Sequence, residues 1–131
     1  MSVRRLHGLA RALRDQRGST AAEFALVLFP LILLTIGSIN VGVMIYTVTT
    51  LHFAAEDAAR CATVKTTVCT DPAATATYAA SRYKGAVSGV TFVQTTAPCG
   101  NVVTGTVTYR FSTGLTATPV PLSASACYPL G

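Results

Sequence analysis

The main pattern in the chain is one long apolar run that lies between a short basic segment and a mixed second half. From Phe24 to Tyr46 the sequence carries no charge over 23 positions. A helix of this length is about 34 Å long, which is enough to cross a bilayer core with some tilt. A core helix of a soluble protein is rarely so long and so uniformly apolar. The run therefore predicts a transmembrane helix over 24–46.

After the apolar run the pattern becomes amphipathic, and the same helix is predicted to continue to Val64. Its apolar stripe consists of Leu51, Ala54, Ala55, Ala58 and Ala62. Because the stripe is thin and rich in alanine, a sheet or another helix could approach it closely. On the other faces, Glu56 and Arg60 are expected to pair at i, i+4, and His52 is expected on the surface.

A short second helix is predicted at the start of the remaining segment, 65–131. Asp71 supplies an N-cap oxygen, and Pro72 suits the first helical position. An amphipathic helix is expected over 72–84, with Gly85 as its stop.

The hydrophobic period then changes to two, which indicates strands. Runs rich in Val, Thr, Phe and Tyr predict strands at about 87–96, 101–112 and 121–128. Pro119 and Pro121 indicate that the last strand starts late or lies on an edge. The predicted fold class is therefore α+β and membrane-anchored, with a long N-terminal transmembrane helix, a short helix and a three-stranded antiparallel sheet.

The distribution of charge predicts how the apolar run is oriented in the membrane. The chain has a net charge of +5, and most of it lies in the first 17 residues. The arginines there are Arg4, Arg5, Arg11, Arg14 and Arg17. Lys and Arg before a membrane span favour a cytoplasmic N-terminus, so the rest of the chain is expected outside. Nucleic-acid binding is not expected, because it needs basic residues gathered on a folded face.

The segment before the apolar run reads Arg17-Gly18-Ser19-Thr20-Ala21-Ala22-Glu23-Phe24. It resembles the processing site of type IV pilin-like proteins, which a membrane prepilin peptidase cuts after the glycine. The resemblance implies a cut between Gly18 and Ser19, so that 1–18 is a leader and the mature helix covers 19–64. The new amine, with a pKa near 8, would then lie four residues from Glu23 on one helix face. Glu23 and Phe24 are thus candidates for subunit registration.

A longer stretch of the sequence resembles one particular family of pilin-like proteins. The sequence RGSTAAEFALVLFPLILL, followed by AAEDAARCA at 54–62, is similar to the TadE-like pseudopilins of the tight-adherence (Flp, type IVb) pilus system. The terminal segments at 107–111 and 122–129 also resemble this family, but weakly. Its major pilins usually have a tyrosine where Phe24 stands. The folded extension after the helix fits a minor pseudopilin better than a major pilin.

Three residues within the apolar run are candidates for helix packing. Pro30 removes one helical hydrogen bond and is expected to bend the helix. Ser38 and Gly42 lie four residues apart on one face and would permit close contact with another helix in lipid. Small residues and proline are also common in transmembrane helices in general, and the pattern does not separate the two readings.

The four cysteines are Cys61, Cys69, Cys99 and Cys127. They lie in the part expected outside the cytoplasm, and an even number in a small head favours disulfides. A zinc site is not expected, because no pair has the close ligand spacing. A hairpin that turns at 112–114 would place Cys99 opposite Cys127, which leaves Cys61 for Cys69.

These patterns predict a protein without catalytic activity, because no nucleophile, base and orienting acid can be placed together. No metal and no cofactor is expected. The resemblance implies a minor pseudopilin of the bacterial inner membrane with a periplasmic head, either at the base of the pilus or incorporated in it. Its implied partners are prepilin peptidase, other pilins and pseudopilins, the inner-membrane assembly platform and the lipid bilayer. The alternatives are an uncleaved single-pass envelope protein with a disulfide-stapled binding domain, and a membrane-tethered enzyme or inhibitor.

Overall fold

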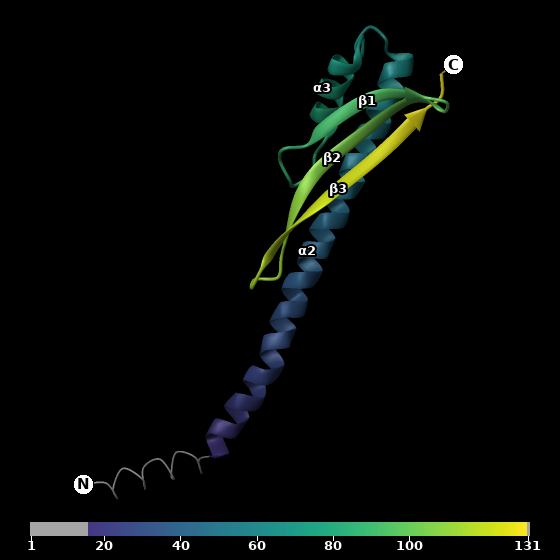
Figure 1. Ribbon diagram of the computed structural model, residues 1–131. Coiled ribbons are helices and arrows are strands. Elements are labelled where there is room, and N and C mark those ends of the chain that lie inside the picture. Colours follow the sequence, from purple (N-terminus) through teal and green to yellow (C-terminus); the bar gives the residue numbers. More distant parts are fainter. Residues whose placement is uncertain (1–15, 131) are drawn as a thin grey trace, which may run out of the picture. The chain divides into compact units, whose positions relative to one another are not determined.

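A computed structural model describes the backbone of residues 16–130 and the side chains of residues 18–130 (Figure 1). The elements are α2 (Gln16–Val64), α3 (Pro72–Arg82), β1 (Thr91–Ala97), β2 (Gly100–Ser112) and β3 (Ala117–Tyr128). This is the predicted α+β class. The chain divides between Gly37 and Ser38 into two compact units. Most of the predicted leader, including the arginines up to Arg14, lies outside the described residues.

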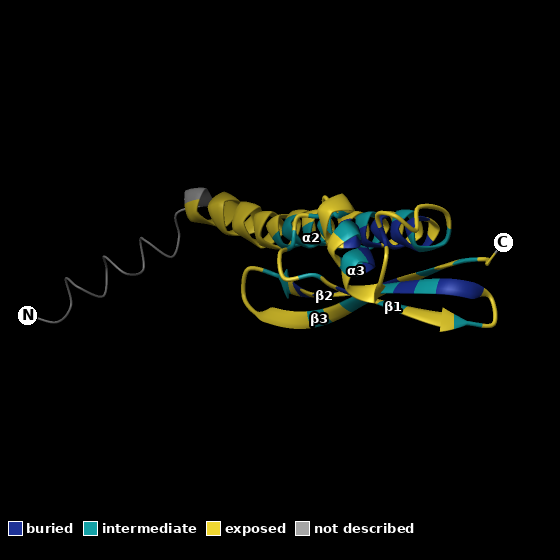
Figure 2. Cartoon of the chain, turned by 90° about the horizontal axis from the view of Figure 1, so that it is seen from above, coloured by how far each residue is buried: buried dark blue, intermediate teal, exposed yellow. Residues whose placement is uncertain are grey.

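Helix α2 begins at Gln16, three residues before the predicted start, and ends at Val64 as predicted. It continues through Pro30. In the described residues it is the one helix that is long and apolar enough to cross a membrane. The most apolar part of α2 has no buried residue, and the part of the helix over 18–32 has the exposed colour in Figure 2.

Helix α3 starts as predicted, because the Asp71 carboxylate accepts a hydrogen bond of 2.8 Å from the Ala74 N–H. It ends at Arg82, two residues earlier than expected, and Tyr83 caps it in an extended conformation. Gly85 is therefore not its stop. A side chain at Gly85 would collide with the Tyr83 ring, so the structure uses this glycine for close packing.

The three strands form an antiparallel sheet in the order β1-β2-β3. Ala97 pairs with Gly100, so Pro98 and Cys99 alone form the turn between β1 and β2. Gly100 has a φ of +129°, which an L side chain rarely adopts. The turn thus depends on glycine at this position.

The last strand differs from its prediction. Strand β3 starts at Ala117 rather than at about 121, and both prolines lie within it. Since β3 is an edge strand, the missing N–H groups of Pro119 and Pro121 interrupt no interior ladder. Of the two expected explanations for these prolines, the edge position is the correct one. Strand β1 starts at Thr91 rather than at about 87.

The core of the second unit lies between one face of the sheet and α2. The buried residues on α2 are Thr47, Leu51, Ala54, Ala55, Ala58, Ala59 and Cys61. Those on the sheet are Phe92, Asn101, Val103, Val107, Tyr109 and Ala124. The predicted stripe is thus confirmed, except that Ala62 is only half-buried. Ala79 of α3 completes the core.

Gly105 lies in the middle of β2 and close to Leu51 of α2. A Cβ atom there would lie 2.7 Å from Leu51 Cδ1 and 2.5 Å from Phe92 Cε1. Phe92 is the cross-strand partner of Gly105, and its ring covers the space that the glycine leaves. Leu51 is 0% exposed as a result. Glycine at this position therefore sets the distance between the sheet and the helix.

Candidate processing segment and assembly helix

The predicted processing segment is helical and exposed. Gly18, Ser19 and Phe24 all lie in the first turns of α2 and on its surface. A side chain added at Gly18 would meet no atom within 4 Å. The first N–H groups of a helix lack intrahelical partners, so these turns open more easily than its middle. Nothing in the described structure therefore requires a glycine at position 18.

Glu23 is the one acidic residue at the head of the apolar run, and its side chain is exposed. Among the side chains that the structure describes, none forms an ion pair with it. An ionised carboxylate at the edge of a bilayer or in an assembly is costly unless a cation lies nearby. The arrangement leaves Glu23 open to a partner from outside the described part.

The apolar side chains that follow Glu23 are exposed as well. Phe24, Leu26 and Leu34 are 68%, 75% and 71% exposed. Gly42, a predicted packing residue, has open space where a side chain would be. Pro30 and Ser38 also lie on the helix surface. The most apolar part of the helix thus has no buried residue among those described, so its side chains are available to lipid or to other helices.

The sheet reaches α2 within the stretch predicted to cross the membrane. The Tyr109 hydroxyl donates to Asn40 Oδ1 at 2.9 Å, and the Ser112 N–H donates to the same oxygen at 3.4 Å. Six residues further along α2, the Tyr46 hydroxyl donates to the carbonyl oxygen of Lys84 at 3.2 Å. The head therefore contacts both Asn40 and Tyr46, which belong to the predicted span 24–46.

Comparison with known families identifies the helix. Residues 18–60 match the sequence model of the TadE-like protein family. This segment is TadE-like. The match begins at Gly18, includes Glu23 and ends at Arg60, so it covers the exposed apolar helix and most of the stripe that carries the sheet. It links the chain to the tight-adherence (Tad) pilus system. No curated protein and no solved structure matches the chain significantly.

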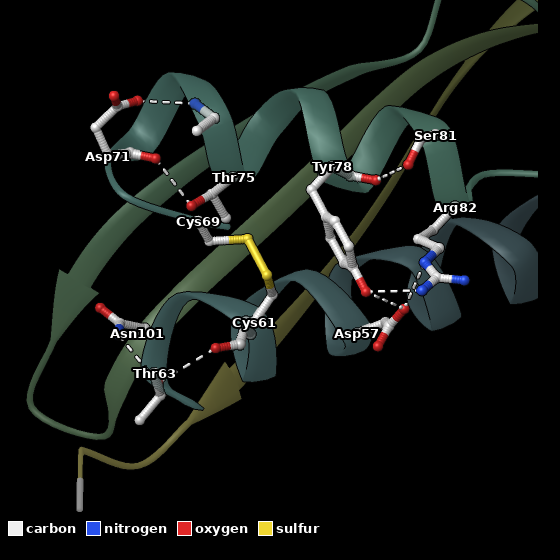
Figure 3. The surroundings of a disulfide bond; sticks show 12 residues. Asp57, Cys61, Thr63, Cys69, Asp71, Thr75, Tyr78, Ser81, Arg82 and Asn101 are labelled. Carbon is white, nitrogen blue, oxygen red and sulfur yellow. Dashed lines mark hydrogen bonds and ion pairs between the residues drawn. A yellow bond between two sulfur atoms is a disulfide. The ribbon is translucent and has the colours of Figure 1, made fainter. Parts of the chain in front are cut away.

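The head of the protein is held together by two disulfides, Cys61–Cys69 and Cys99–Cys127. The first joins the end of α2 to the loop before α3 (Figure 3). This is the pairing that the hairpin prediction favoured, but the predicted register was wrong. Cys127 pairs across the strands with Val102, while Cys99 lies in the β1–β2 turn. The second disulfide therefore joins that turn to β3.

The register differs because the turn between β2 and β3 is longer than expected. Ser112 pairs with Ala117, so the turn consists of residues 113–116. As a result, each β2 residue pairs with a β3 residue that lies three positions further along the chain than the predicted hairpin would give. The disulfide still forms, because Cys99 precedes β2 by one residue and its Cα lies 6.4 Å from that of Cys127.

Helix α3 is fixed to α2 by a polar cluster, which Figure 3 shows beside the first disulfide. Arg82 Nε lies 3.0 Å from Asp57 Oδ2, and the Tyr78 hydroxyl donates to the same oxygen at 3.2 Å. Arg82 also donates to the Tyr78 hydroxyl oxygen at 2.9 Å. The hydrogen bond to Tyr78, followed by the charges around it, raises the pKa of Arg82. The cluster holds the Arg82 side chain of α3 against Asp57 of α2.

Charge pairing on α2 differs from the prediction. Glu56 pairs with His52, with 3.4 Å between His52 Nδ1 and Glu56 Oε1, and no ion pair between Glu56 and Arg60 forms among the described side chains. His52 is exposed as predicted. An i, i+4 pair on either side of Glu56 is sterically equivalent, so the sequence could not decide between the two.

Two residues that position the sheet on α2 were not among the predicted site residues. Asn40 lies within the apolar run, where it is the one amide side chain. Gly105 lies inside a predicted strand, where a glycine often marks a close approach of another element. Both residues can be recognised in the sequence, but the sequence does not show which residues they contact.

Proposed function

We propose that this protein is a minor pseudopilin of the tight-adherence system, processed by a prepilin peptidase and used in the assembly of Flp pili. The observation that carries the proposal is the family match, which begins at Gly18 and continues along the exposed apolar helix. The leader would lie in the cytoplasm and the head in the periplasm, where the two disulfides would persist. We propose no enzymatic role.

Processing would free the amine of Ser19 at the start of the mature helix. Glu23 would then have a cation one helical turn away, on its own chain or on a neighbouring helix. Such a pair would satisfy the carboxylate once the helices pack side by side and exclude water. In this proposal Glu23 fixes the longitudinal position of one subunit against the next, and Phe24 packs beside it.

The same helix would serve first as an anchor and then as an assembly surface. Its exposed apolar side chains would contact lipid in the inner membrane and other pilin helices in an assembly. The Ser38–Gly42 face would allow two backbones to approach closely. The expected partners are therefore prepilin peptidase, pilins and pseudopilins of the same system, and the assembly platform in the inner membrane.

Processing can be tested by co-expressing the full chain with a prepilin peptidase and measuring the mass of the product. We expect a new N-terminus at Ser19, and Gly18→Ala should prevent it. Gly37→Ala is the matched control, because neither added methyl group meets an atom within 4 Å and both should leave the fold unchanged. If the wild-type chain keeps its N-terminus while a control pilin is cut, the chain is an uncleaved envelope protein instead.

Registration can be tested separately with Glu23→Gln, which keeps the shape of the side chain and removes its charge. We expect normal cutting after Gly18 but reduced crosslinking to neighbouring pilins in the membrane. Normal crosslinking and normal pilus formation by this variant would refute the role of Glu23 and leave the processing proposal in place.

A further inference from the structure

The hairpin turn between β2 and β3, residues 113–116, lies at one end of the sheet, alongside α2 (Figure 1). Tyr109 and Ser112 bind it to Asn40 of α2, with Tyr109 Oη and Asn40 Oδ1 separated by 2.9 Å. Tyr109 is buried, so this connection is part of the packed head. The position of the turn along α2 is thereby fixed at the level of Asn40.

The length of the apolar run places Asn40 near the outer surface of a bilayer. A transmembrane helix needs about 20 residues. Counted from Phe24, such a span ends near Val43, and counted from Ser19 it ends near Ser38. Asn40 lies three residues before the first of these ends and two residues after the second, and it is in the outer third of the predicted span 24–46. A turn at the level of Asn40 therefore meets the headgroup layer.

The composition around the turn suits that environment. Leu115 at its tip is 72% exposed and is not part of the hydrophobic core. From Phe111 to Leu130 the sequence carries no charge, and Arg110 immediately before this stretch is exposed. Tyr46 and Lys84, which are hydrogen-bonded to each other, are also of the residue types that anchor proteins at the headgroup level.

Three of the four backbone N–H groups of the turn, those of Thr113, Gly114 and Thr116, are paired within it or with Ser112. The Thr113 N–H donates to the Thr116 carbonyl oxygen at 3.1 Å, and the Thr116 N–H donates to Thr113 Oγ1 at 3.4 Å. The Gly114 N–H donates to Ser112 Oγ at 3.3 Å. Removal of water from a backbone that is already paired costs little compared with an unpaired one.

We propose that this turn is a second membrane contact of the protein, in which Leu115 inserts into the headgroup layer on the outer side of the bilayer. The proposal rests on the membrane-spanning role of α2. Its consequence is that the head does not swing freely on its anchor but rests on the lipid surface until the protein leaves the membrane. The turn would then be released together with the helix.

The chain contains no tryptophan, so a single introduced tryptophan can report on each position. The full chain is reconstituted at low density into vesicles whose lipids are brominated on the acyl chains near the headgroup. Leu115→Trp should show blue-shifted emission and roughly twofold quenching, as an indole at the interface would. Val68→Trp, in the exposed loop after α2, is the matched control and should be quenched by iodide but not by brominated lipid.

Leu34→Trp, within the apolar run and measured in parallel vesicles whose lipids are brominated deep in the acyl chains, separates failure of this inference from failure of the anchor. If lipid quenches the Leu34→Trp variant while iodide alone quenches the Leu115→Trp variant, the helix spans the membrane and the proposed contact is wrong. If lipid quenches neither variant, the anchor itself fails. Blue-shifted emission of the Leu115→Trp variant that appears at high protein density alone, without lipid quenching, would assign the turn to a neighbouring copy and overturn the proposal.

Discussion

The contact between the sheet and α2 depends on the missing side chain at Gly105, and Gly105→Ala tests this directly. An added methyl carbon would lie 2.5 Å from Phe92 Cε1 and 2.7 Å from Leu51 Cδ1. Carbon atoms in contact prefer a separation of about 3.5–4.0 Å, so both neighbours must move by about 1 Å. Overpacking of this kind costs about 1–3 kcal/mol.

A smaller effect acts in the opposite direction. Alanine restricts the unfolded chain more than glycine does, which stabilises the folded state by about 0.4–1 kcal/mol. With the middle of both ranges, the expected net loss is about 1.3 kcal/mol. For a head of this size each kcal/mol corresponds to about 4–8 °C in the midpoint of thermal unfolding.

The assay is thermal unfolding of the full chain in detergent micelles, with the disulfides intact, followed by near-ultraviolet circular dichroism. Gly42→Ala is the matched control, because the same methyl group meets no atom within 4 Å there and should not lower the midpoint. Leu51→Ala alone should cost about 2–5 kcal/mol through the cavity that it leaves.

The double variant gives the sharper result. In Gly105→Ala combined with Leu51→Ala, the new methyl group enters space that the leucine has vacated. The combined loss should then be smaller than the sum of the single losses by at least about 0.5 kcal/mol, as for residues in direct contact. Additive losses, or a Gly105→Ala variant as stable as the wild type, would refute the close-approach explanation.

The remaining predictions concern the hydroxyl groups, the alkaline limit and the disulfides. The buried Tyr83 hydroxyl lies near the Val87 backbone but forms no hydrogen bond of ordinary geometry among the described residues, so Tyr83→Phe should change stability little. Tyr78→Phe should lose about 1 kcal/mol with its hydrogen bonds, and equal losses in thermal unfolding would contradict this. Burial raises the pKa of Tyr83, and the nearby Val87 backbone lowers it by less. The stability that depends on the neutral hydroxyl is therefore complete below pH 10 and is lost as the pH rises through the higher pKa of the folded state. An unfolding titration should show this alkaline loss, and it should be smaller in Tyr83→Phe. Chain-entropy estimates give about 3.6 kcal/mol for Cys99–Cys127, which closes a separation of 28 residues, and about 2.5 kcal/mol for the other disulfide, with a separation of 8. Replacement of both cysteines of Cys99–Cys127 by serine should therefore destabilise the head more than the same replacement at Cys61–Cys69. The reverse order in denaturant unfolding would count against the loop-length argument.

Much of the architecture could be predicted from local sequence. An uncharged run longer than a bilayer core, followed by an alanine stripe at helical spacing, is sufficient to predict α2 and its end at Val64. Asp71 and Pro72 mark the start of α3 by local hydrogen bonding, and a period of two marks the strands. These features depend on residues close together in the chain, so no knowledge of the packing is needed. The processing segment belongs to the same class, because its signal is a short linear motif around Gly18 and Glu23.

Other features were decided by tertiary structure, because they depend on contacts between distant residues. The hairpin register follows from a four-residue turn whose length the strand pattern does not fix, and the disulfide pairing was therefore predicted from a wrong alignment. The partner of Glu56 was a choice between equivalent neighbours. How far the sheet extends along α2 could not be predicted from the sequence either, since Asn40 and Tyr109 lie 69 positions apart. The sequence by itself determined an apolar helix with a basic leader before it and a small head after it, and packing alone set the tip of that head at the level of Asn40.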